Sequence, residues 1–318
     1  MSDAAISEAP VEARPPKRRT DWWGEVKGIF WLLPVVLGFH SFIAKPFYIP
    51  SESMLPGLEV GDRLVVTKFS YGWSFVSPTI PNPLAIFRSV VLRRPEASWT
   101  VQIPFMHGRL LGRLPERGDV VIVTPPGTRN DYIKRVIGLP GDTLAVRDGT
   151  VILNGKPVRR GPLHYVDLPD YGGTLAPDGS ETCDEGGLGG AAARRRAADG
   201  GFICHLPIVT ETLPNGRRFD TVELGASQGD EVSPLVIPAN HVFLMGDNRD
   251  RSADSRFELR DGGLGGPVPY ENLGGRAEFI TFSLDGTTTW NPLTWFTSLR
   301  GGRAGTSLHA PKDGNQAP

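Results

Sequence analysis

The chain has 318 residues, enough for one large or two ordinary domains with a well-buried core. Its 39 glycines and 29 prolines exceed the usual combined share of about 12% and favour a turn-rich chain with short strands over a helical bundle or coiled coil. The 34 Lys and Arg residues nearly balance the 35 Asp and Glu residues, which excludes the basic field of a nucleic-acid-binding protein and the charge excess of a disordered chain.

An uncharged apolar segment near the N-terminus predicts a membrane anchor. Residues 28–44 read GIFWLLPVVLGFHSFIA and carry no formal charge when His40 is neutral. This length is the lower limit for a helix that crosses about 30 Å of hydrocarbon. Flanking aromatic residues lengthen the segment: Trp22, Trp23, Phe47 and Tyr48. We therefore expect a single transmembrane signal anchor at residues 28–46.

The charges before this segment predict its orientation. Basic residues outnumber the acidic Asp21 and Glu25 there: Arg14, Lys17, Arg18, Arg19 and Lys27. The positive-inside rule then places residues 1–27 in the cytoplasm and everything after the anchor on the far side of the membrane.

Two other interpretations of the apolar segment stay open. A cleaved signal peptide has a similar charge pattern, but Phe42-Ile43-Ala44 puts a bulky residue where a small one is required. A buried core helix would accommodate Pro34, His40 and Ser41 more readily than a lipid-exposed span would.

The rest of the chain predicts a mainly β, antiparallel domain over residues 47–300. Short β-branched runs bounded by turn residues occur at 62–69, 118–126, 131–142, 143–158, 241–247 and 277–284. Asp148-Gly149 and Asn154-Gly155 are strong hairpin signals, because both residues of a type I′ turn need positive φ. Two stretches lack the pattern and are expected to be insertions, near 72–117 and 171–201. Residues 301–318 are expected to form a flexible C-terminal tail.

The second insertion carries Arg194, Arg195 and Arg196 without interleaved aromatic residues, so we expect a solvated segment and no nucleic-acid partner. Cys183 and Cys204 flank it, and both a disulfide and two free thiols stay open. Neither the two cysteines nor the six histidines show a metal-binding spacing. We expect no metal and no cofactor.

One serine motif is expected to be misleading. Gly225-Ala226-Ser227-Gln228-Gly229 fits the nucleophile elbow of α/β-hydrolases, which needs a strand before it and a helix after it. Pro234 and Pro238 in the following residues prevent that helix. We therefore exclude Ser227 as the nucleophile.

A better candidate follows the anchor, in Pro50-Ser51-Glu52-Ser53-Met54-Leu55-Pro56. The prolines fix φ at each end and favour a rigid extended segment that another chain can approach. In such a segment Ser51 and Ser53 point to the same face, so one hydroxyl could attack while the other holds an oxyanion. The alternative is a solvent-exposed, Ser-rich linker.

Lys134 is the candidate base, within the apolar strand pattern at 131–142. Burial disfavours an ammonium group and can lower a lysine pKa by about 3–5 units, which leaves a neutral amine able to accept a proton. The alternative is an exposed charge on a β edge, like Arg135. Strand alternation places these two on opposite faces, so only one is expected to point inward with Tyr132 and Val136.

Three segments in order, PSESM, DYIKRVIGLPGD and GDNRDRSADSR (246–256), resemble the motifs of bacterial type I signal peptidases. That family comprises membrane-anchored Ser/Lys proteases that remove signal peptides from exported proteins, with a mostly β fold and an active site near the outer membrane surface. The resemblance implies a single-pass protein of the bacterial inner (cytoplasmic) membrane, with its catalytic domain on the periplasmic side. Implied partners are preprotein signal peptides, the lipid bilayer and the nearby export translocon.

The resemblance also implies residue roles. Ser53 matches the nucleophile and Lys134 the general base, and Ser51 would hold the oxyanion with the backbone N–H of Ser53. Ser252 resembles the residue that orients the lysine amine, and Asp254 and Arg256 resemble a supporting ion pair. The pockets that select Ala-x-Ala would be lined by Phe47, Ile49, Pro50, Met54, Tyr132 and Ile133.

The sequence departs from the family pattern at two positions and leaves two rival functions. Glu52 replaces a common glycine and is expected to point away from Ser53, whereas Gly57 replaces a common threonine and is expected to loosen the segment. The rivals are a narrow-specificity Ser/Lys maturation peptidase of conjugation type and a non-enzymatic anchored β domain.

Overall fold

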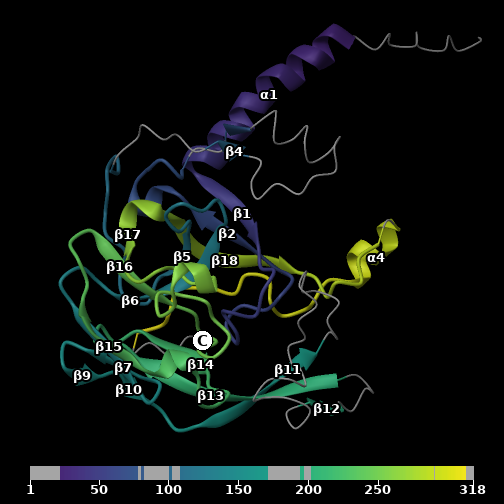
Figure 1. Cartoon of the computed structure of the whole chain (residues 1–318). Helices are drawn as coiled ribbons and strands as arrows, with labels where there is room; N and C mark the ends of the chain where they lie inside the picture. The colour runs from purple at the N-terminus through teal and green to yellow at the C-terminus, as the bar shows by residue number, and fades with distance from the viewer. Residues whose placement is uncertain are drawn as a thin grey trace, which may run out of the picture.

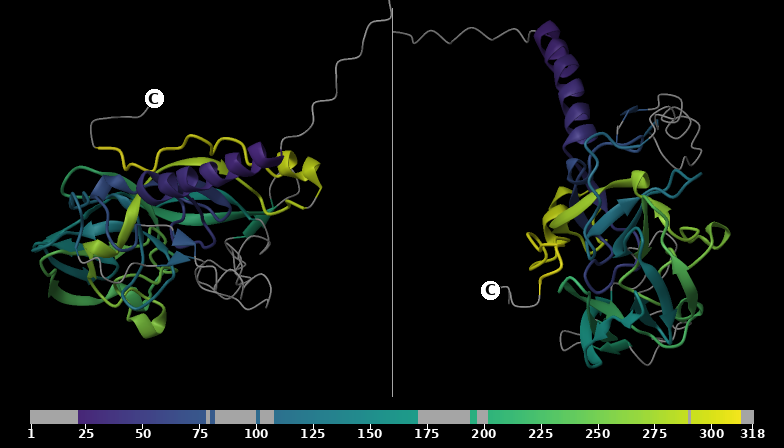
Figure 2. Two further views of the ribbon diagram at one scale, coloured as in Figure 1. Left: turned by 90° about the horizontal axis from the view of Figure 1, so that it is seen from above. Right: turned by 90° about the vertical axis from the view of Figure 1, so that its left-hand side faces the viewer.

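The computed structural model describes residues 22–77, 80–81, 100–101, 108–170, 194–196, 202–289 and 291–312. Its order of elements is one long N-terminal helix followed by short strands, and the β domain is antiparallel apart from one isolated parallel bridge. Figure 1 and the right-hand view of Figure 2 show the helix projecting from one end of this β domain. The predicted mainly β fold with one N-terminal apolar helix is confirmed.

Helix α1 (Trp22–Phe42) is long and apolar enough to cross a membrane. It begins six residues before the expected anchor, because the amphipathic aromatic flank is itself helical, and it ends earlier. Residues 44–46, which we expected within the anchor, lie in strand β1 (Ala44–Tyr48). They pair with β2 (Asp62–Thr67), in the register Ala44↔Thr67. Their backbone N–H and C=O groups therefore find partners in the sheet directly after the helix ends.

The largest sheet has seven strands in the order β1-β2-β18-β5-β6-β16-β17. Its further strands are β5 (Val120–Val123), β6 (Tyr132–Gly138), β16 (His241–Met245), β17 (Val268–Pro269) and β18 (Leu273–Ser283). The β-branched runs expected at 62–69, 118–126, 131–142, 241–247 and 277–284 all contribute strands to this sheet. Side chains of this sheet and of the loop after β1 form one apolar core, which includes Ile49, Met54, Val120 and Ile133.

A four-stranded sheet packs against it, in the order β15-β7-β8-β9. Its strands are β7 (Thr143–Arg147), β8 (Thr150–Leu153), β9 (Lys156–Pro157) and β15 (Val232–Val236). Both predicted hairpin turns are present: φ is 46° at Asp148 and 70° at Gly149, and 53° at Asn154 and 76° at Gly155. Positive φ at both positions matches the right-handed twist of the paired strands.

A five-stranded sheet contains strands that the sequence pattern did not predict. They are β10 (Arg159–Arg160), β11 (His164–Asp170), β12 (Arg194–Arg196), β13 (Phe202–Thr212) and β14 (Arg218–Val222). The three arginines expected in a solvated insertion form β12, because their backbone pairs with β13 in the register Arg194↔Cys204. Cys204 is disulfide-bonded, and Cys183 lies outside the described residues.

The remaining described elements are short. They are the pair β3 (Ile80–Pro81) and β4 (Thr100–Val101), the 3-10 turns η1 (Phe69–Tyr71), η2 (Gln228–Asp230), η3 (Leu259–Asp261) and η4 (Tyr270–Asn272), and helix α4 (Pro292–Thr297). Most of the expected insertion at 72–117 lies outside the described residues.

Residues 301–312 were expected to form a flexible tail, but the structure shows them bound to the β domain. Backbone hydrogen bonds tie this segment first to β18, at Leu308 N to Glu278 O (2.9 Å), and then to β14, at Arg218 N to Pro311 O (2.8 Å). Leu308 is buried in the main core. We call residues 300–312 the C-terminal strap. Leu308 is the one large aliphatic side chain in this polar stretch, and tertiary contacts order it; residues 313–318 lie outside the described part.

Replacing Leu308 with alanine is expected to lower the free energy of unfolding by about 2–4 kcal/mol, because it leaves a cavity in the main core. Urea unfolding of the detergent-solubilised chain measures the change. Leu293→Ala is the matched control, since Leu293 is 72% exposed and its loss is expected to change stability by less than about 0.5 kcal/mol. An equal change in the free energy of unfolding for the two substitutions would mean that Leu308 of the strap does not stabilise the core.

Candidate active site

Ser53 lies in the connection between β1 and β2, which we call the Ser53 loop (residues 50–61). Backbone hydrogen bonds close its base, from Ile49 N to Asp62 O and from Gly61 N to Ile49 O, both 3.0 Å. Within it, Leu55 N donates to Glu52 O and Leu58 N to Met54 O. The extended segment expected here is therefore wrong: the loop turns, because its base is closed and its apolar side chains turn back into the core.

The Ser53 hydroxyl and the Lys134 amine are in direct contact. Lys134 Nζ donates a hydrogen bond to Ser53 Oγ at 2.9 Å. Strand β6 delivers Lys134, which lies opposite Val121 of β5. Both side chains are buried, with Ser53 7% and Lys134 2% exposed. The structure thus brings together two residues that are 81 positions apart in the sequence.

Burial lowers the pKa of Lys134 from its usual 10.5 to about 8, although the nearby carboxylates of Asp254 and Asp247 favour the charged form. A substantial fraction of the amine is therefore neutral at mildly alkaline pH. A neutral amine within hydrogen-bond distance of a hydroxyl can remove its proton.

Ser51 lies beside this pair. Its Oγ is 3.5 Å from Ser53 Oγ, and the side chain is half-buried. The expectation that both hydroxyls share one side holds, although the backbone between them is bent rather than extended. Ser51 can therefore donate to an oxygen atom that develops negative charge near Ser53.

The ion pair between Asp254 and Arg256 is present and buried. Arg256 Nε and Nη2 each lie 2.9 Å from a different oxygen of Asp254, and both side chains are at most 1% exposed. Burial raises the pKa of Asp254, but Arg256 and the N–H of Gly246 outweigh it and bring the pKa below its ordinary value. The Asp254 carboxylate therefore stays charged beside Lys134.

Ser252 differs from expectation. Its Oγ is buried and has no hydrogen-bond partner among the described residues, so it makes no hydrogen bond to the Lys134 amine, which donates to Ser53. Ser252 packs on Gly246: a Cβ there would lie 2.2 Å from Ser252 Oγ and 2.4 Å from the Ser53 carbonyl oxygen. The glycine thus allows the 246–256 segment to approach the Ser53 backbone.

Arg135 corrects the expectation that only one of the two adjacent cations points inward. Both are buried, on opposite faces of β6, because the five-stranded sheet covers the second face. There Arg135 makes two hydrogen bonds to Asp247, at 2.6 and 2.7 Å, and its guanidinium lies 4.3 Å from the Phe219 ring of β14. The charge is compensated by its partner rather than by solvent.

The six residues expected to line the substrate pockets lie in different surroundings. Ile49, Met54 and Ile133 are buried in the main core, and Phe47 packs against it. Tyr132 packs against the neighbouring cluster around Val121 and Val136, with its ring 5.8 Å from Lys134 Nζ. Pro50 is exposed. Three of the six residues therefore lie in the core, Phe47 and Tyr132 at its margin, and Pro50 at the surface.

Asn248 was missed in the sequence. Its backbone N–H donates to Ser53 O at 3.2 Å, and its side-chain amide donates to Glu52 O at 3.3 Å. The Glu52 carboxylate is buried and pairs with Arg251 at 3.5 Å. Asn248 and Arg251 both belong to the segment 246–256, which resembles a family motif. Their place in this motif was the signal from which both residues could have been predicted.

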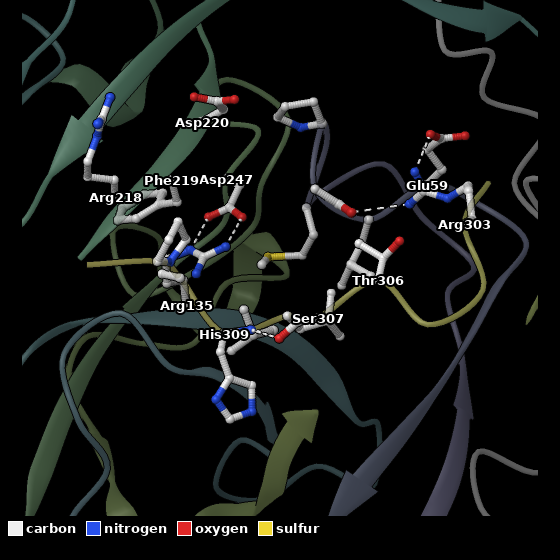
Figure 3. A pocket seen from close by; sticks show the side chains of 18 of the residues that line it. Glu59, Arg135, Arg218, Phe219, Asp220, Asp247, Arg303, Thr306, Ser307 and His309 are labelled. Atoms are coloured by element: carbon white, nitrogen blue, oxygen red, sulfur yellow. Dashed lines mark hydrogen bonds and ion pairs between the residues drawn. The ribbon is translucent and has the colours of Figure 1, made fainter. Parts of the chain in front are cut away.

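A cavity of about 310 Å³ lies on the other side of the Ser53 loop, between this loop, β14 and the C-terminal strap. Figure 3 shows Glu59 and Arg303 at one side of it and Arg135 with Asp247 at another. Neither Ser53 nor Lys134 lines this cavity, although Met54 does. It is therefore separate from the Ser53–Lys134 pair.

Two other features play no part in this site. The Ser227 motif is followed by η2 and β15 and not by an α-helix, which agrees with its exclusion. Within the described ranges, no group of three or more His, Cys, Asp or Glu side chains could hold a metal ion.

Comparisons with known proteins agree on one family. A family model described as signal peptidase, peptidase S26, matches residues 22–282. Proteins named signal peptidase I from Rickettsia typhi and Rickettsia akari are 32% and 30% identical, over 81% and 83% of this chain and 80% of theirs. A crystal structure of a signal peptidase I from Enterococcus faecalis covers 52% of this chain and 97% of its own, with 24% identity and a TM-score of 0.25.

Proposed function

The chain belongs to the signal peptidase family, peptidase S26, whose members named above are signal peptidases I, and from this membership we propose that it removes N-terminal signal peptides from exported preproteins with a Ser53–Lys134 dyad. The chain is a serine peptidase by family. The observation that carries the dyad is the 2.9 Å hydrogen bond between the buried Lys134 amine and the Ser53 hydroxyl.

In the proposed reaction, neutral Lys134 takes the proton of Ser53 as Oγ attacks the carbonyl carbon of the scissile bond. The carbonyl oxygen becomes an oxyanion, to which the Ser51 hydroxyl and the Ser53 N–H donate. Lys134 then passes its proton to the leaving amine, and the C–N bond breaks. Water, deprotonated by Lys134, hydrolyses the acyl-enzyme, which releases the signal peptide and restores Ser53.

Substrate selection is proposed to work by exclusion. Bulky apolar side chains around the dyad leave shallow space, which fits small residues at the first and third positions before the cleaved bond. The proposed lining residues are Phe47, Pro50, Tyr132 and Ile133, whereas Ile49 and Met54 are at most 1% exposed and lie in the core. Cleavage after Ala-x-Ala follows from this shape.

The membrane arrangement is also part of the proposal. Helix α1 would cross the bacterial inner membrane once, with residues 1–27 in the cytoplasm and the β domain on the periplasmic side near the translocon. Strand β1 follows α1 after one residue, and the Ser53 loop begins at the other end of this five-residue strand. The dyad there would cleave signal peptides that emerge from the bilayer.

The test is cleavage of several unrelated preproteins by the full-length chain in detergent micelles, with the new N-termini identified by mass spectrometry. We expect cleavage after Ala-x-Ala, and a loss of at least about 100-fold when the residue before the bond is replaced by leucine, which the shallow pocket cannot accept. Cleavage of a single preprotein only would support the narrow-specificity maturation peptidase. No cleavage of any preprotein would contradict the proposal.

A further inference from the structure

The hydrogen bonds within the Ser53 loop fix only its turns and its base, so its position depends on the burial of its apolar side chains and on contacts from other segments. On the catalytic side, Lys134 contacts Ser53 Oγ, and Asn248 contacts the carbonyls of Glu52 and Ser53. On the opposite side lies the 310 Å³ cavity, lined by Met54, Pro56 and Gly57 among others. Met54 and Leu58 also pack into the main core, whereas the loop around Gly57 borders this cavity.

Two arginines of the C-terminal strap bind the loop, and one of them, Arg303, lines the cavity. Arg303 Nη1 donates to Glu59 Oε1 at 2.6 Å, Nε to Asp62 Oδ1 at 2.9 Å, and Nη2 to the carbonyl oxygen of Gly57 at 3.1 Å. Arg300 Nη1 donates to the other carboxylate oxygen of Glu59 at 2.6 Å, and Nη2 donates to Val60 O. Figure 3 shows the Glu59–Arg303 pair at the cavity wall.

These contacts are shielded from solvent. The Asp62 side chain is fully buried, those of Arg300 and Glu59 are 7% and 11% exposed, and that of Arg303 is 19% exposed. Burial raises the pKa of Glu59, while Arg303 and Arg300 oppose the rise. Removing one arginine would leave the carboxylates of Glu59 and Asp62 with only the other arginine as compensating charge. This loss of charge compensation favours displacement of the loop or protonation of Glu59.

The base of the loop leaves no room for adjustment. Gly61 has φ of 95°, and a Cβ there would lie 2.1 Å from the Leu284 carbonyl oxygen and 2.9 Å from Arg300 Nη2. The loop, the end of β18 and Arg300 are therefore in close contact. Loss of the arginines would remove hydrogen bonds from residues 57–62, the part of the loop that follows the segment carrying Ser53.

We propose that Arg300 and Arg303 are positioning residues for the peptidase reaction, which hold Gly57, Glu59 and Asp62 so that Ser53 Oγ stays within hydrogen-bond distance of Lys134. They act through the loop and do not touch the reacting atoms. This inference rests on the proposed role of Ser53. It assigns a catalytic contribution to the C-terminal strap, at the far end of the chain from the nucleophile.

The geometry predicts which kinetic constant changes. A displacement of about 1 Å between nucleophile and base can lower a rate about 100-fold. Gly57, Glu59 and Asp62 are not among the residues proposed to line the substrate pocket. Loss of Arg303 is therefore expected to lower kcat and to leave KM almost unchanged.

The test uses the full-length chain in detergent and a preprotein with Ala-x-Ala before the cleaved bond. We expect Arg303→Met to lower kcat about 10- to 100-fold with KM within about twofold of the parent. Arg303→Lys is expected to recover part of the loss, because an ammonium can pair with one carboxylate but cannot make three directed hydrogen bonds. Arg260→Met is the matched control, since Arg260 is 77% exposed and far from the loop in sequence, and its kcat should be unchanged.

A smaller change guards against unfolding of the Met variant. Glu59→Gln keeps the shape of the side chain and is expected to lower kcat about 3- to 10-fold. All rates are measured at a temperature where near-ultraviolet circular dichroism shows that the parent and the variants are folded. A parental kcat in both Arg303→Met and Glu59→Gln overturns the inference, as does an equal loss in Arg303→Lys and Arg303→Met. Ser53→Ala in the same series separates the two proposals: processing by Ser53→Ala refutes the dyad, whereas an inactive Ser53→Ala beside a fully active Arg303→Met refutes only the positioning role.

Discussion

Replacing Ser53 with alanine is expected to abolish preprotein processing, with kcat reduced by at least about 10⁴-fold, because no other atom can form the acyl-enzyme. The chain should still fold and insert into membranes, since the hydroxyl contributes only hydrogen bonds to Lys134 and Ser51. Single-turnover cleavage of a radiolabelled preprotein in proteoliposomes measures the loss.

Ser227→Ala is the matched control for this experiment. Ser227 belongs to the G-x-S-x-G match at residues 225–229. A nucleophile elbow needs an α-helix after the serine, but η2 and β15 follow Ser227. Its hydroxyl caps the turn with Asp230, so the control is expected to change stability slightly and processing not at all. If Ser227→Ala lost activity and Ser53→Ala kept it, Ser227 and not Ser53 would be the nucleophile.

Replacing Lys134 with methionine is expected to lower the rate about as much as Ser53→Ala, because nucleophile and base act as a unit and their effects are not additive. The double variant should therefore lose little more than either single variant. Methionine has a similar length and suits the buried site, so the substitution tests the amine rather than the packing.

The pH dependence of the parent chain reports on the same amine. The proposed reaction needs neutral Lys134, and burial lowers its pKa to about 8, so the protonated form, which cannot act as the base, dominates below that pH. The rate is expected to rise with pH up to about 8 and then to level off. A rate that falls between pH 7 and 9 would contradict a lysine base.

Lys68→Met is the control for a buried lysine as such. Burial also lowers the pKa of Lys68 to about 8, but its Nζ donates to the carbonyl oxygen of Ser77 and it lies at the membrane end of the domain. Its replacement is expected to leave the pH profile of processing unchanged. A shifted pH profile in Lys68→Met would mean that Lys68, and not Lys134, causes the pH dependence of processing.

The local patterns of the sequence were sufficient for much of the fold. Asp148-Gly149 and Asn154-Gly155 formed the predicted hairpin turns, because their conformational preference acts over two residues. The β-branched runs became strands of the large sheet, apart from the run at 143–158, which forms β7, β8 and β9 of the four-stranded sheet. Strand β13 (Phe202–Thr212) was missed because it adjoins a small-residue segment and reads as a strand only when β11 and β14 pair with it.

The candidate site divides in the same way. Ser53, Lys134, Asp254 and Arg256 were predicted from motif order, and the structure places them together, as ion pair and hydrogen bond partners. Ser252 was expected on the lysine amine but packs on Gly246 without a hydrogen-bond partner in the described part of the chain. A motif specifies which residues are near each other, whereas the direction of a hydroxyl depends on sub-ångström packing.

The sequence by itself determined the apolar helix, the β-rich class and the residues of the Ser–Lys pair, because each depends on composition, short-range preference or an ordered motif. Only the tertiary structure decided that Arg135 is buried beside Lys134, that the Ser53 loop turns instead of extending, and that Arg303 reaches back to Gly57. Each of these depends on which surface covers a residue. Such contacts join segments far apart in the chain, and burial of a charge is tolerable only where a distant partner compensates it.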